Sequence, residues 1–230
     1  MILKKLLLLF FIIFLFNQNL NSLEITQIKA EGYFRGEHNR SAHFLSEVSA
    51  IGAVELENKY TFSGGLSIGI TLIDTGINAF TKINYSPFLN LPLSFSVSYI
   101  YNGLLEYQTH THSVFPLISY NADRAGISLG TNFRFSRFFG EKSQFESVFS
   151  LYGYFNFINN DVLTLGIGFG NFNDFSAKNL GAFSYYLNAD VSLNNNWQII
   201  NQIELMQSGM DGLSATFFGM AFRTGVKYTW

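Results

Sequence analysis

The sequence predicts an all-β fold, and three observations lead to this prediction. Apolar and polar residues alternate with a period of two from about residue 23 to the C-terminus, which is the pattern of β-strands and not of helices. Aromatic residues make up 17% of the 230 residues, and charged residues make up 13%, about half the fraction typical of soluble domains. No long apolar run occurs after residue 16, which argues against a bundle of membrane-spanning helices.

The composition also excludes several classes of protein. The formal net charge of −2 lacks the basic excess of a typical nucleic-acid-binding protein, so we expect no nucleic-acid partner. The absence of cysteine excludes disulfide bonds, thiolate metal sites and a cysteine nucleophile. The high aromatic content argues against a disordered chain. These exclusions leave a folded β-protein that has to accommodate many aromatic side chains.

The N-terminus differs from the rest of the chain and predicts a cleaved signal peptide. Lys4 and Lys5 give it a basic start, an unbroken apolar run covers residues 6–16, and a short polar stretch follows. The apolar run is roughly half of the 20 residues that a spanning helix needs, which argues against an uncleaved anchor. We therefore expect a signal peptide over 1–22 and a single mature domain over 23–230.

The mature chain divides into about twelve alternating segments, which are interrupted by residues typical of turns. The clearest are 60–72, where aliphatic residues alternate with Ser, Gly and Thr, and 183–193 and 218–230, where aromatic residues join the apolar face. The segment 112–120 is the weakest, because Pro116 removes a backbone donor in mid-strand. In order, the predicted strands are 25–36, 43–56, 60–72, 78–86, 93–104, 112–120, 125–138, 144–157, 161–171, 180–193, 196–206 and 214–230.

The chain length and the connections both fit twelve strands. The mature chain has 230 − 22 = 208 residues, about 17 for each strand with its connection, and a tilted spanning strand needs about 9–11. Ten strands remain an alternative if 78–120 divides differently. Connections after even-numbered segments are short, such as 57–59, with 86–92 as the exception, and those after odd-numbered segments tend to be longer: 101–112, 171–179 and 207–215. Short turns at one rim and longer loops at the other are typical of a membrane barrel.

The placement of the charges distinguishes a soluble β-sandwich from a membrane barrel. A sandwich carries its charges outside, whereas a membrane barrel directs its apolar face to lipid and its polar face to the lumen. The apolar faces here are rich in aromatic residues and carry charges only near strand ends, at Glu24 and Arg137, while the opposite faces are rich in Gly and Ser. This favours a transmembrane antiparallel up-and-down β-barrel. We expect its lumen to be lined by Lys29, Glu31, Arg35, Glu47, Glu55, Lys82, Arg134, Glu146, Asp190, Glu204, Arg223 and Lys227.

The last eight residues, RTGVKYTW, carry a recognisable pattern. The polar Arg223 is followed by Gly225, Tyr228 and the terminal Trp230. This pattern resembles the C-terminal insertion signal of bacterial outer-membrane β-barrel proteins of porin-like architecture, with no specific subfamily. The resemblance implies location in the bacterial outer membrane, closure of the last strand against the first, and recognition by periplasmic chaperones and the barrel-assembly machinery. Outer-membrane lipid is then a partner, and the oligomeric state stays open.

Residues with the chemistry for a metal or catalytic site are few. His38, His43, His110 and His112 lie in or beside the predicted long loops, where solvated histidines are the ordinary interpretation. Metal sites usually need three or four ligands with supporting hydrogen bonds, so we expect no metal and no cofactor. His112 lies at about the height of the Ser–His pair of outer-membrane phospholipases, but their sequence motif is absent, as is the Asp-x-His triplet of outer-membrane proteases. We therefore expect no enzymatic activity.

Two functions are compatible with the predicted barrel. The first is a narrow porin-like channel for small hydrophilic solutes, whose lumen charges are balanced and able to pair with one another. The second is a surface-exposed binding or structural barrel with a plugged lumen, which contacts an external ligand through its loops. Small residues in 60–72 and 161–171 leave room either for a passage or for inward aromatic side chains, namely Phe115, Tyr152, Tyr154 and Tyr186.

Overall fold

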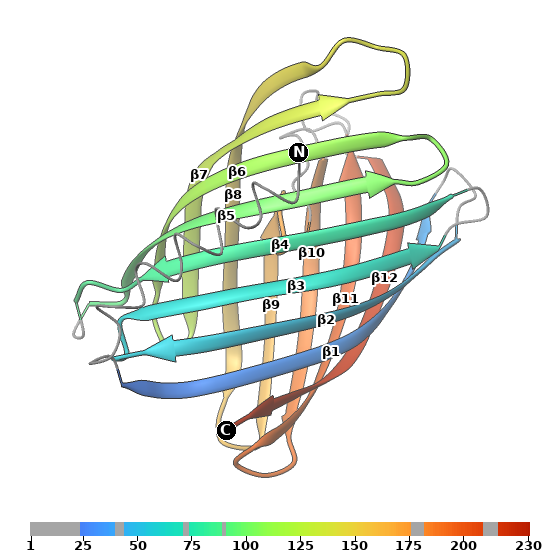
Figure 1. The fold of residues 1–230 in the computed structure, drawn as a ribbon. Helices are drawn as coiled ribbons and strands as arrows, with labels where there is room; N and C mark the ends of the chain where they lie inside the picture. The colour runs from blue at the N-terminus through green and yellow to red at the C-terminus, as the bar shows by residue number, and fades with distance from the viewer. Residues whose placement is uncertain (1–23, 40–43, 71–73, 89–90, 176–181, 209–215) are drawn as a thin grey trace.

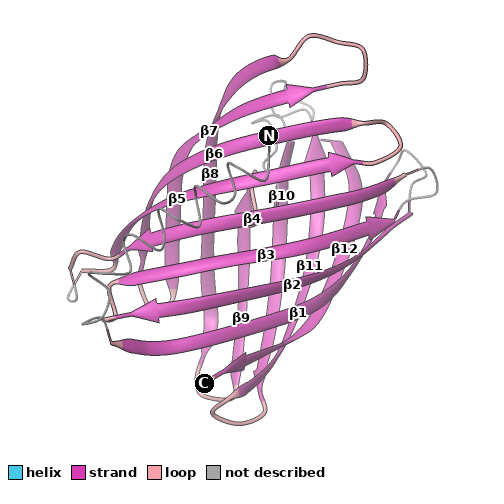
Figure 2. Ribbon diagram, viewed as in Figure 1, coloured by secondary structure: helices cyan, strands magenta, loops and turns pink. Residues whose placement is uncertain are grey.

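The computed structural model is a closed β-barrel of twelve strands (Figure 1; Figure 2). It describes residues 24–39, 44–70, 74–88, 91–175, 182–208 and 216–230, so the predicted signal peptide over 1–22 lies outside the described residues. Strands adjacent in sequence pair antiparallel, and the first strand pairs with the last. In the described part of the chain, no helix is long and apolar enough to cross a membrane. The prediction of an antiparallel barrel with twelve strands is confirmed, and the ten-strand alternative is wrong.

The strands follow the alternating segments, with shifts of a few residues at their ends. The predicted long connection 101–112 is instead a short turn over 105–108, because the flanking strands extend to Leu104 and from Thr109. Tyr101 and His110 stack across these strands with ring centroids 6.0 Å apart, which favours the extra pairing. In order, the strands are β1 (Ile25–Asn39), β2 (Phe44–Leu56), β3 (Tyr60–Ile70), β4 (Thr75–Tyr85), β5 (Leu93–Leu104), β6 (Thr109–Asn121), β7 (Ala125–Arg137), β8 (Gln144–Asn159), β9 (Leu163–Gly170), β10 (Ala182–Ser192), β11 (Trp197–Ser208) and β12 (Thr216–Thr229).

Pro116 lies in the middle of β6 and interrupts one ladder without ending the strand. Pairing with β7 is continuous up to Val114 and resumes at Leu117. Pairing with β5 continues through Pro116, which lies opposite Val97. The Pro116 carbonyl approaches Gly130 of β7 so closely that a β-carbon at Gly130 would collide with it. The segment predicted as the weakest strand therefore forms, because the gap in the ladder is confined to one side and a glycine admits the proline.

Exposure alternates along the strands in the sense opposite to that of a soluble protein. Val48 is 64% exposed, whereas its neighbours in β2, Glu47 and Ser49, are only 6% and 3% exposed. In β3, Leu66 is 64% exposed and Ser67 is 1% exposed. A soluble sheet would bury the aliphatic side chains and expose the polar ones, because removing apolar surface from water stabilises the fold. Lipid covers such an outer surface in a membrane barrel, so the barrel is of the transmembrane type.

The two rims of the barrel differ. The chain ends at Trp230 on the rim that also holds the turns 57–59 and 122–124, which we call the terminal rim; the opposite one is the loop rim (Figure 1). Trp197 and Tyr228 pack edge-on at the terminal rim with ring centroids 4.7 Å apart, and Tyr228 packs on Trp230 at 4.5 Å. Such clusters are typical of the aromatic belts at membrane–water interfaces.

Candidate functional site

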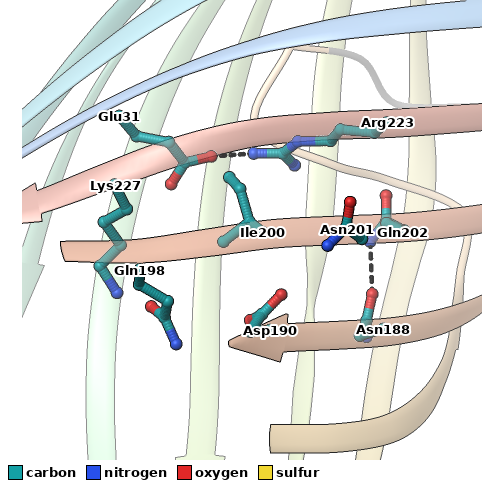
Figure 3. A pocket seen from close by; sticks show the side chains of 9 residues that line it. All are labelled: Glu31, Asn188, Asp190, Gln198, Ile200, Asn201, Gln202, Arg223 and Lys227. Atoms are coloured by element: carbon teal, nitrogen blue, oxygen red, sulfur yellow. Dashed lines mark hydrogen bonds and ion pairs between the residues drawn. The ribbon is translucent and has the colours of Figure 1, made fainter. Parts of the chain in front are cut away.

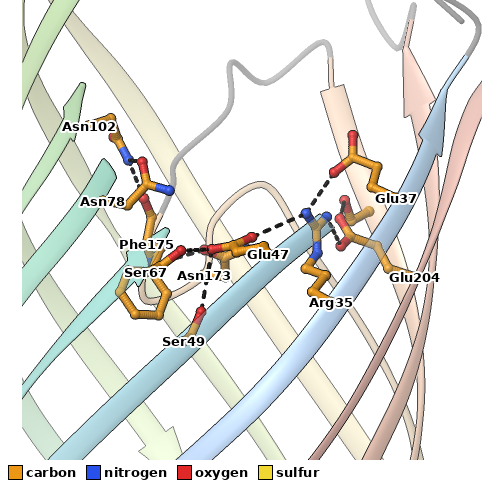
Figure 4. Close-up of polar contacts among 11 residues, drawn as sticks. Arg35, Glu37, Glu47, Ser49, Ser67, Asn78, Asn102, Asn173, Phe175 and Glu204 are labelled. Atoms are coloured by element: carbon orange, nitrogen blue, oxygen red, sulfur yellow. Dashed lines mark hydrogen bonds and ion pairs between the residues drawn. The ribbon is translucent and has the colours of Figure 1, made fainter. Parts of the chain in front are cut away.

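The lumen contains a charged cluster on the side formed by β1, β2 and β11 (Figure 4). Arg35 donates from Nη1 to Oε2 of Glu37 at 2.6 Å and from Nη2 to Oε2 of Glu204 at 2.8 Å. Its Nη1 also lies 3.7 Å from Oε2 of Glu47. One cation thus faces three carboxylates. We call these four residues the Arg35 cluster.

Serine hydroxyls support two carboxylates of the Arg35 cluster. Ser67 and Ser49 donate to Oε1 of Glu47, the latter at 3.4 Å. Ser184 of β10 donates to Oε1 of Glu204. Glu47 and Glu204 are only 6% and 3% exposed, and a buried carboxylate is costly unless it is both paired and hydrogen-bonded. The strands therefore supply the partners that make two buried glutamates tolerable.

A second ion pair lies where β12 closes against β1. Arg223 pairs with Glu31 (Figure 3). Its Cζ lies 3.6 Å from the centroid of the Tyr33 ring. Arg223 is also the register partner of Arg35, which places two cations side by side on the inner face. Like charges directly opposite each other are destabilising. Each arginine turns to its own carboxylates, so that the repulsion between them is offset.

A polar cavity of about 170 Å³ lies beside this ion pair, nearer the terminal rim (Figure 3). Its wall combines charged groups with side-chain amides, and Asn188 accepts a hydrogen bond from Gln202 at 2.8 Å. Its lining residues include Glu31, Asp190, Arg223 and Lys227.

A larger cavity of about 480 Å³ lies on the other side of the same arginine. Arg35, Glu204 and Lys82 line it, together with several aromatic side chains. Arg223 and Gln202 line both cavities, so they mark the boundary between them. The lumen therefore holds two adjoining spaces that share Arg223 and Gln202.

The remaining predicted charges pair near the rims. Nζ of Lys29 lies 3.9 Å from Oε2 of Glu55, and Arg134 donates to Oε1 of Glu146 at 2.5 Å. With these pairs, each of the twelve charges predicted for the lumen either forms an ion pair or lines one of the two cavities.

Residues 171–175, which follow β9, enter the lumen; we call them the inner segment (Figure 4). Phe172 packs edge-on against Phe115, with ring centroids 4.7 Å apart. Phe175 packs edge-on against Phe80 at 5.0 Å and is only 5% exposed. The inner segment therefore places two aromatic rings across the barrel interior.

Hydrogen bonds fix both ends of the inner segment. At its start, the Asn171 side chain donates from Nδ2 to the Phe149 carbonyl and accepts from the Leu151 amide, both at 2.9 Å. It thereby extends the hydrogen bonding between β9 and β8 beyond the end of β9. At its end, Asn102 of β5 donates to the Phe175 carbonyl at 2.6 Å. Because Asn171 and Phe175 are both buried, these contacts hold the inner segment as part of the folded core.

The wall that the inner segment packs against is uncharged. Every inward position of β5 and β6 is Ser, Asn, Thr or an apolar residue. Ile100, Phe115 and Leu117 form a buried cluster with Phe80 and Phe175. The inward residues of these two strands that are buried are Ser94, Ser96, Ser98, Ile100, Ser113, Phe115, Leu117 and Ser119.

The small inward residues of β3 and β9 accommodate aromatic side chains. A β-carbon at Gly65 would lie 2.7 Å from Cε1 of Phe80, and one at Gly170 would lie 2.8 Å from Cδ2 of Tyr152. The sequence left open whether these small residues line a passage or make room for inward aromatic rings. At Gly65 and Gly170 they make room for aromatic rings.

Sequence reasoning missed the apolar part of the lumen. Phe80, Ile100 and Leu117 occupy inward positions that the alternation assigns to polar residues. The two phenylalanines of the inner segment were visible only as unusual residues in a polar loop, NFNDFSAKN. Two Phe within four residues of such a loop are the signal that would have indicated burial.

The histidines that the structure describes are separate from the lumen. Nδ1 of His110 lies 2.8 Å from the Tyr101 hydroxyl, and Nδ1 of His112 lies 2.7 Å from the Tyr99 hydroxyl. Ser113 faces the lumen and is 3% exposed, so it is on the opposite face of β6 from His112. Among the residues that the structure describes, no group of three His, Asp or Glu side chains is arranged to hold a metal ion. His38 is exposed on β1, and His43 lies outside the described residues.

This fold and this charged lumen define the class of protein: an outer-membrane-type β-barrel. No family model matches the sequence, and no curated protein does. Among solved structures, the chain is similar to the NanC porin, with a TM-score of 0.56, 12% identity, and coverage of 87% of this chain and 98% of that one. It is also similar to an outer membrane channel from Pseudomonas putida F1, with a TM-score of 0.55, 11% identity and coverage of 90% and 96%.

A third similar structure is the translocator domain of the autotransporter NalP from Neisseria meningitidis, with a TM-score of 0.54, 14% identity and coverage of 88% and 87%. The three proteins are 11–14% identical to this chain, so the similarity shows the fold alone. The function has to be argued from the lumen itself.

Proposed function

We propose that the chain is a narrow outer-membrane channel for small hydrophilic solutes, with the predicted lumen charges along the solute path. The observation that carries this proposal is the pair of polar cavities that meet at Arg223. Charged and amide side chains line both spaces, as they do in water-filled membrane barrels. A solute would pass the inner segment and then Arg223, and both restrict its size.

The charges along the cavities are close to balanced. The larger cavity is lined by three basic side chains and two carboxylates, and the smaller one by two of each. Ion selectivity in channels usually comes from rings of charge of one sign. We therefore expect small hydrophilic solutes to pass without a strong preference for either sign of charge.

Planar-bilayer recording on the purified protein tests the channel. We expect reproducible conductance steps, and larger steps for the double variant Phe172→Ala/Phe175→Ala, because two rings leave the lumen. Phe155→Ala is the matched control, since Phe155 is 50% exposed on the outer face. The absence of steps from both the wild type and the double variant would contradict the proposal.

A plugged barrel is the second candidate, and the buried ring of Phe175 favours it. Its packing on Phe80 and its hydrogen bond from Asn102 are those of a fixed core residue. In that case the wild type shows no steps, whereas the double variant conducts. The loops at the loop rim would then carry the function by contacting an external ligand.

We also propose that a cleaved signal peptide directs export of the chain. Periplasmic chaperones and the barrel-assembly machinery then insert the barrel, and they recognise the C-terminal signal formed by Arg223, Gly225, Tyr228 and Trp230. The closed pairing of β1 with β12 supports the role of the last strand. N-terminal sequencing of the protein from an outer-membrane fraction tests the first part, and a start near residue 23 is expected. Recovery of the intact N-terminus would contradict cleavage.

A further inference from the structure

The outer face of β5, β6 and β7 carries a polar patch near the loop rim. His110 and His112 of β6 and Arg137 of β7 lie on the same face as Val114 and Phe135, which are 41% and 50% exposed to the membrane side. A cation and two imidazoles on a lipid-facing surface are costly in hydrocarbon. Their position at the strand ends places them at headgroup level instead.

The register makes these side chains neighbours. His110 is paired with Gly103 on one side and Arg137 on the other, and the next row holds Tyr101, His112 and Phe135. Directly opposite residues of antiparallel strands have Cβ atoms about 4.5–5.5 Å apart on the same face. His110 and Arg137 are therefore adjacent, and His112 lies one row deeper.

Two tyrosines orient the imidazole rings. The Tyr101 hydroxyl lies 2.8 Å from Nδ1 of His110, and the rings stack at an interplanar angle of 23°. Gly103 makes room for this arrangement, since a β-carbon there would lie 2.5 Å from the Tyr101 hydroxyl. The Tyr99 hydroxyl lies 2.7 Å from Nδ1 of His112. With Nδ1 engaged, Nε2 is the nitrogen that each ring offers to a ligand.

The surroundings suit an amphipathic ligand. Phe138, Phe139 and Phe145 are 41%, 73% and 59% exposed close to Arg137, which provides apolar surface beside the cation. The nearby connections carry Glu106, Glu141 and Lys142, a net charge of 1 − 2 = −1, and all three lie outside the strands that hold the patch. The built charge of the patch is that of Arg137, whose planar guanidinium matches phosphate geometry.

We propose that His110, His112 and Arg137 bind the phosphomonoester headgroup of an anionic lipid in the leaflet at the loop rim. Arg137 donates two hydrogen bonds to the phosphate oxygens, and Nε2–H of the histidines adds further donors. The exposed phenylalanines contact the upper part of the acyl chains. The site lies outside the barrel and does not depend on channel activity.

Lipid titration tests the site. The protein is placed in nanodiscs of phosphatidylcholine, and phosphatidic acid with the same acyl chains is added, with bound lipid counted by native mass spectrometry. We expect phosphatidic acid to bind preferentially, and Arg137→Gln to weaken its binding about tenfold, the effect of losing a charge-assisted contact. The double variant His110→Gln/His112→Gln should weaken binding by a smaller factor.

Arg124→Gln is the matched control, because Arg124 is an exposed arginine in a turn at the terminal rim. It should bind phosphatidic acid as the wild type does. If Arg137→Gln fails to fold, Arg137→Lys replaces it and should give an intermediate loss, since the charge stays and the two-pronged contact goes. Equal binding by the wild type and the Arg137 variants overturns the proposal. The proposal is also overturned if inorganic phosphate alone raises the melting temperature as much as phosphatidic acid does, and if this rise depends on Arg137. That result would make the site one for free phosphate.

Discussion

The two walls of the lumen are built by different means. On the side of β1, β2 and β11, Arg35 binds three carboxylates in a network of ion pairs and serine hydrogen bonds. On the side of β5 and β6, inward serines alternate with Ile100, Phe115 and Leu117, and the inner segment packs onto them. Both walls are buried, yet one is stabilised by electrostatic pairing and the other by apolar packing.

The difference shows how a barrel interior can be filled without becoming one continuous apolar core. The apolar wall anchors the inner segment, which needs buried rings to hold it in place. The charged wall faces the cavities, where water and paired partners keep ionised groups tolerable. Tyr33 of β1 also packs edge-on against Phe175, with ring centroids 6.5 Å apart, so the inner segment contacts both walls.

The largest effect is expected from removing the cation of the charged wall. Arg35→Met leaves three carboxylates without their common partner, and we expect the free energy of unfolding to fall by about 3 kcal/mol or more. Urea unfolding in detergent measures it. Lys29→Met is the control, because the Lys29 and Glu55 side chains of this 3.9 Å pair are 36% and 26% exposed, and a loss below about 1 kcal/mol is expected. Equal losses would mean that the Arg35 cluster contributes no more than a surface pair.

A somewhat smaller effect is expected from the apolar wall. Phe115 is 1% exposed and contacts Phe172, so Phe115→Ala should lower the free energy of unfolding by about 3 kcal/mol through the cavity it leaves. The same unfolding assay on Phe155→Ala, a lipid-facing phenylalanine, should give a smaller loss. A larger loss for Phe155→Ala would indicate that the lumen rings are loosely packed.

The smallest effect concerns Asp74, at the loop rim between β3 and β4. Desolvation alone would raise the pKa of Asp74, but the amides of Glu106, Thr75 and Tyr107 donate to its carboxylate and lower the pKa overall. A carboxyl whose pKa is lowered in the folded state contributes its full stabilisation at pH values above its unfolded-state pKa, about 3.9. That contribution to stability is lost as the pH falls through the folded-state pKa.

Hydrogen exchange measures this local effect. The amides of Glu106 and Tyr107 should exchange faster in Asp74→Asn at neutral pH, and protection in the wild type should decline only in acid. Unchanged protection in Asp74→Asn would mean that the turn between β5 and β6 is held by the backbone bond from Leu105 to Thr75 instead.

Much of the wall could be predicted from the sequence. Alternation in segments such as 60–72 predicts a two-faced strand, and the structure has β3 over Tyr60–Ile70 with alternating exposure. The inward position of Phe80 was not predictable by the same rule, because alternation assigns faces by polarity and an apolar inward residue looks like an error in the pattern.

The sequence by itself determined the two-faced strands, their antiparallel order and the face that meets lipid, because a period of two and short connections are local properties. It left ten and twelve strands open, and the closed structure decided for twelve. Only the tertiary structure decided what fills the lumen. Arg35 and Glu204 are 169 residues apart in the sequence, and they are in contact because β1 pairs with β12, which lies next to β11. Phe175 contacts Phe80 because the inner segment folds into the lumen. Contacts of that kind depend on the closed register, which no local pattern in the chain encodes.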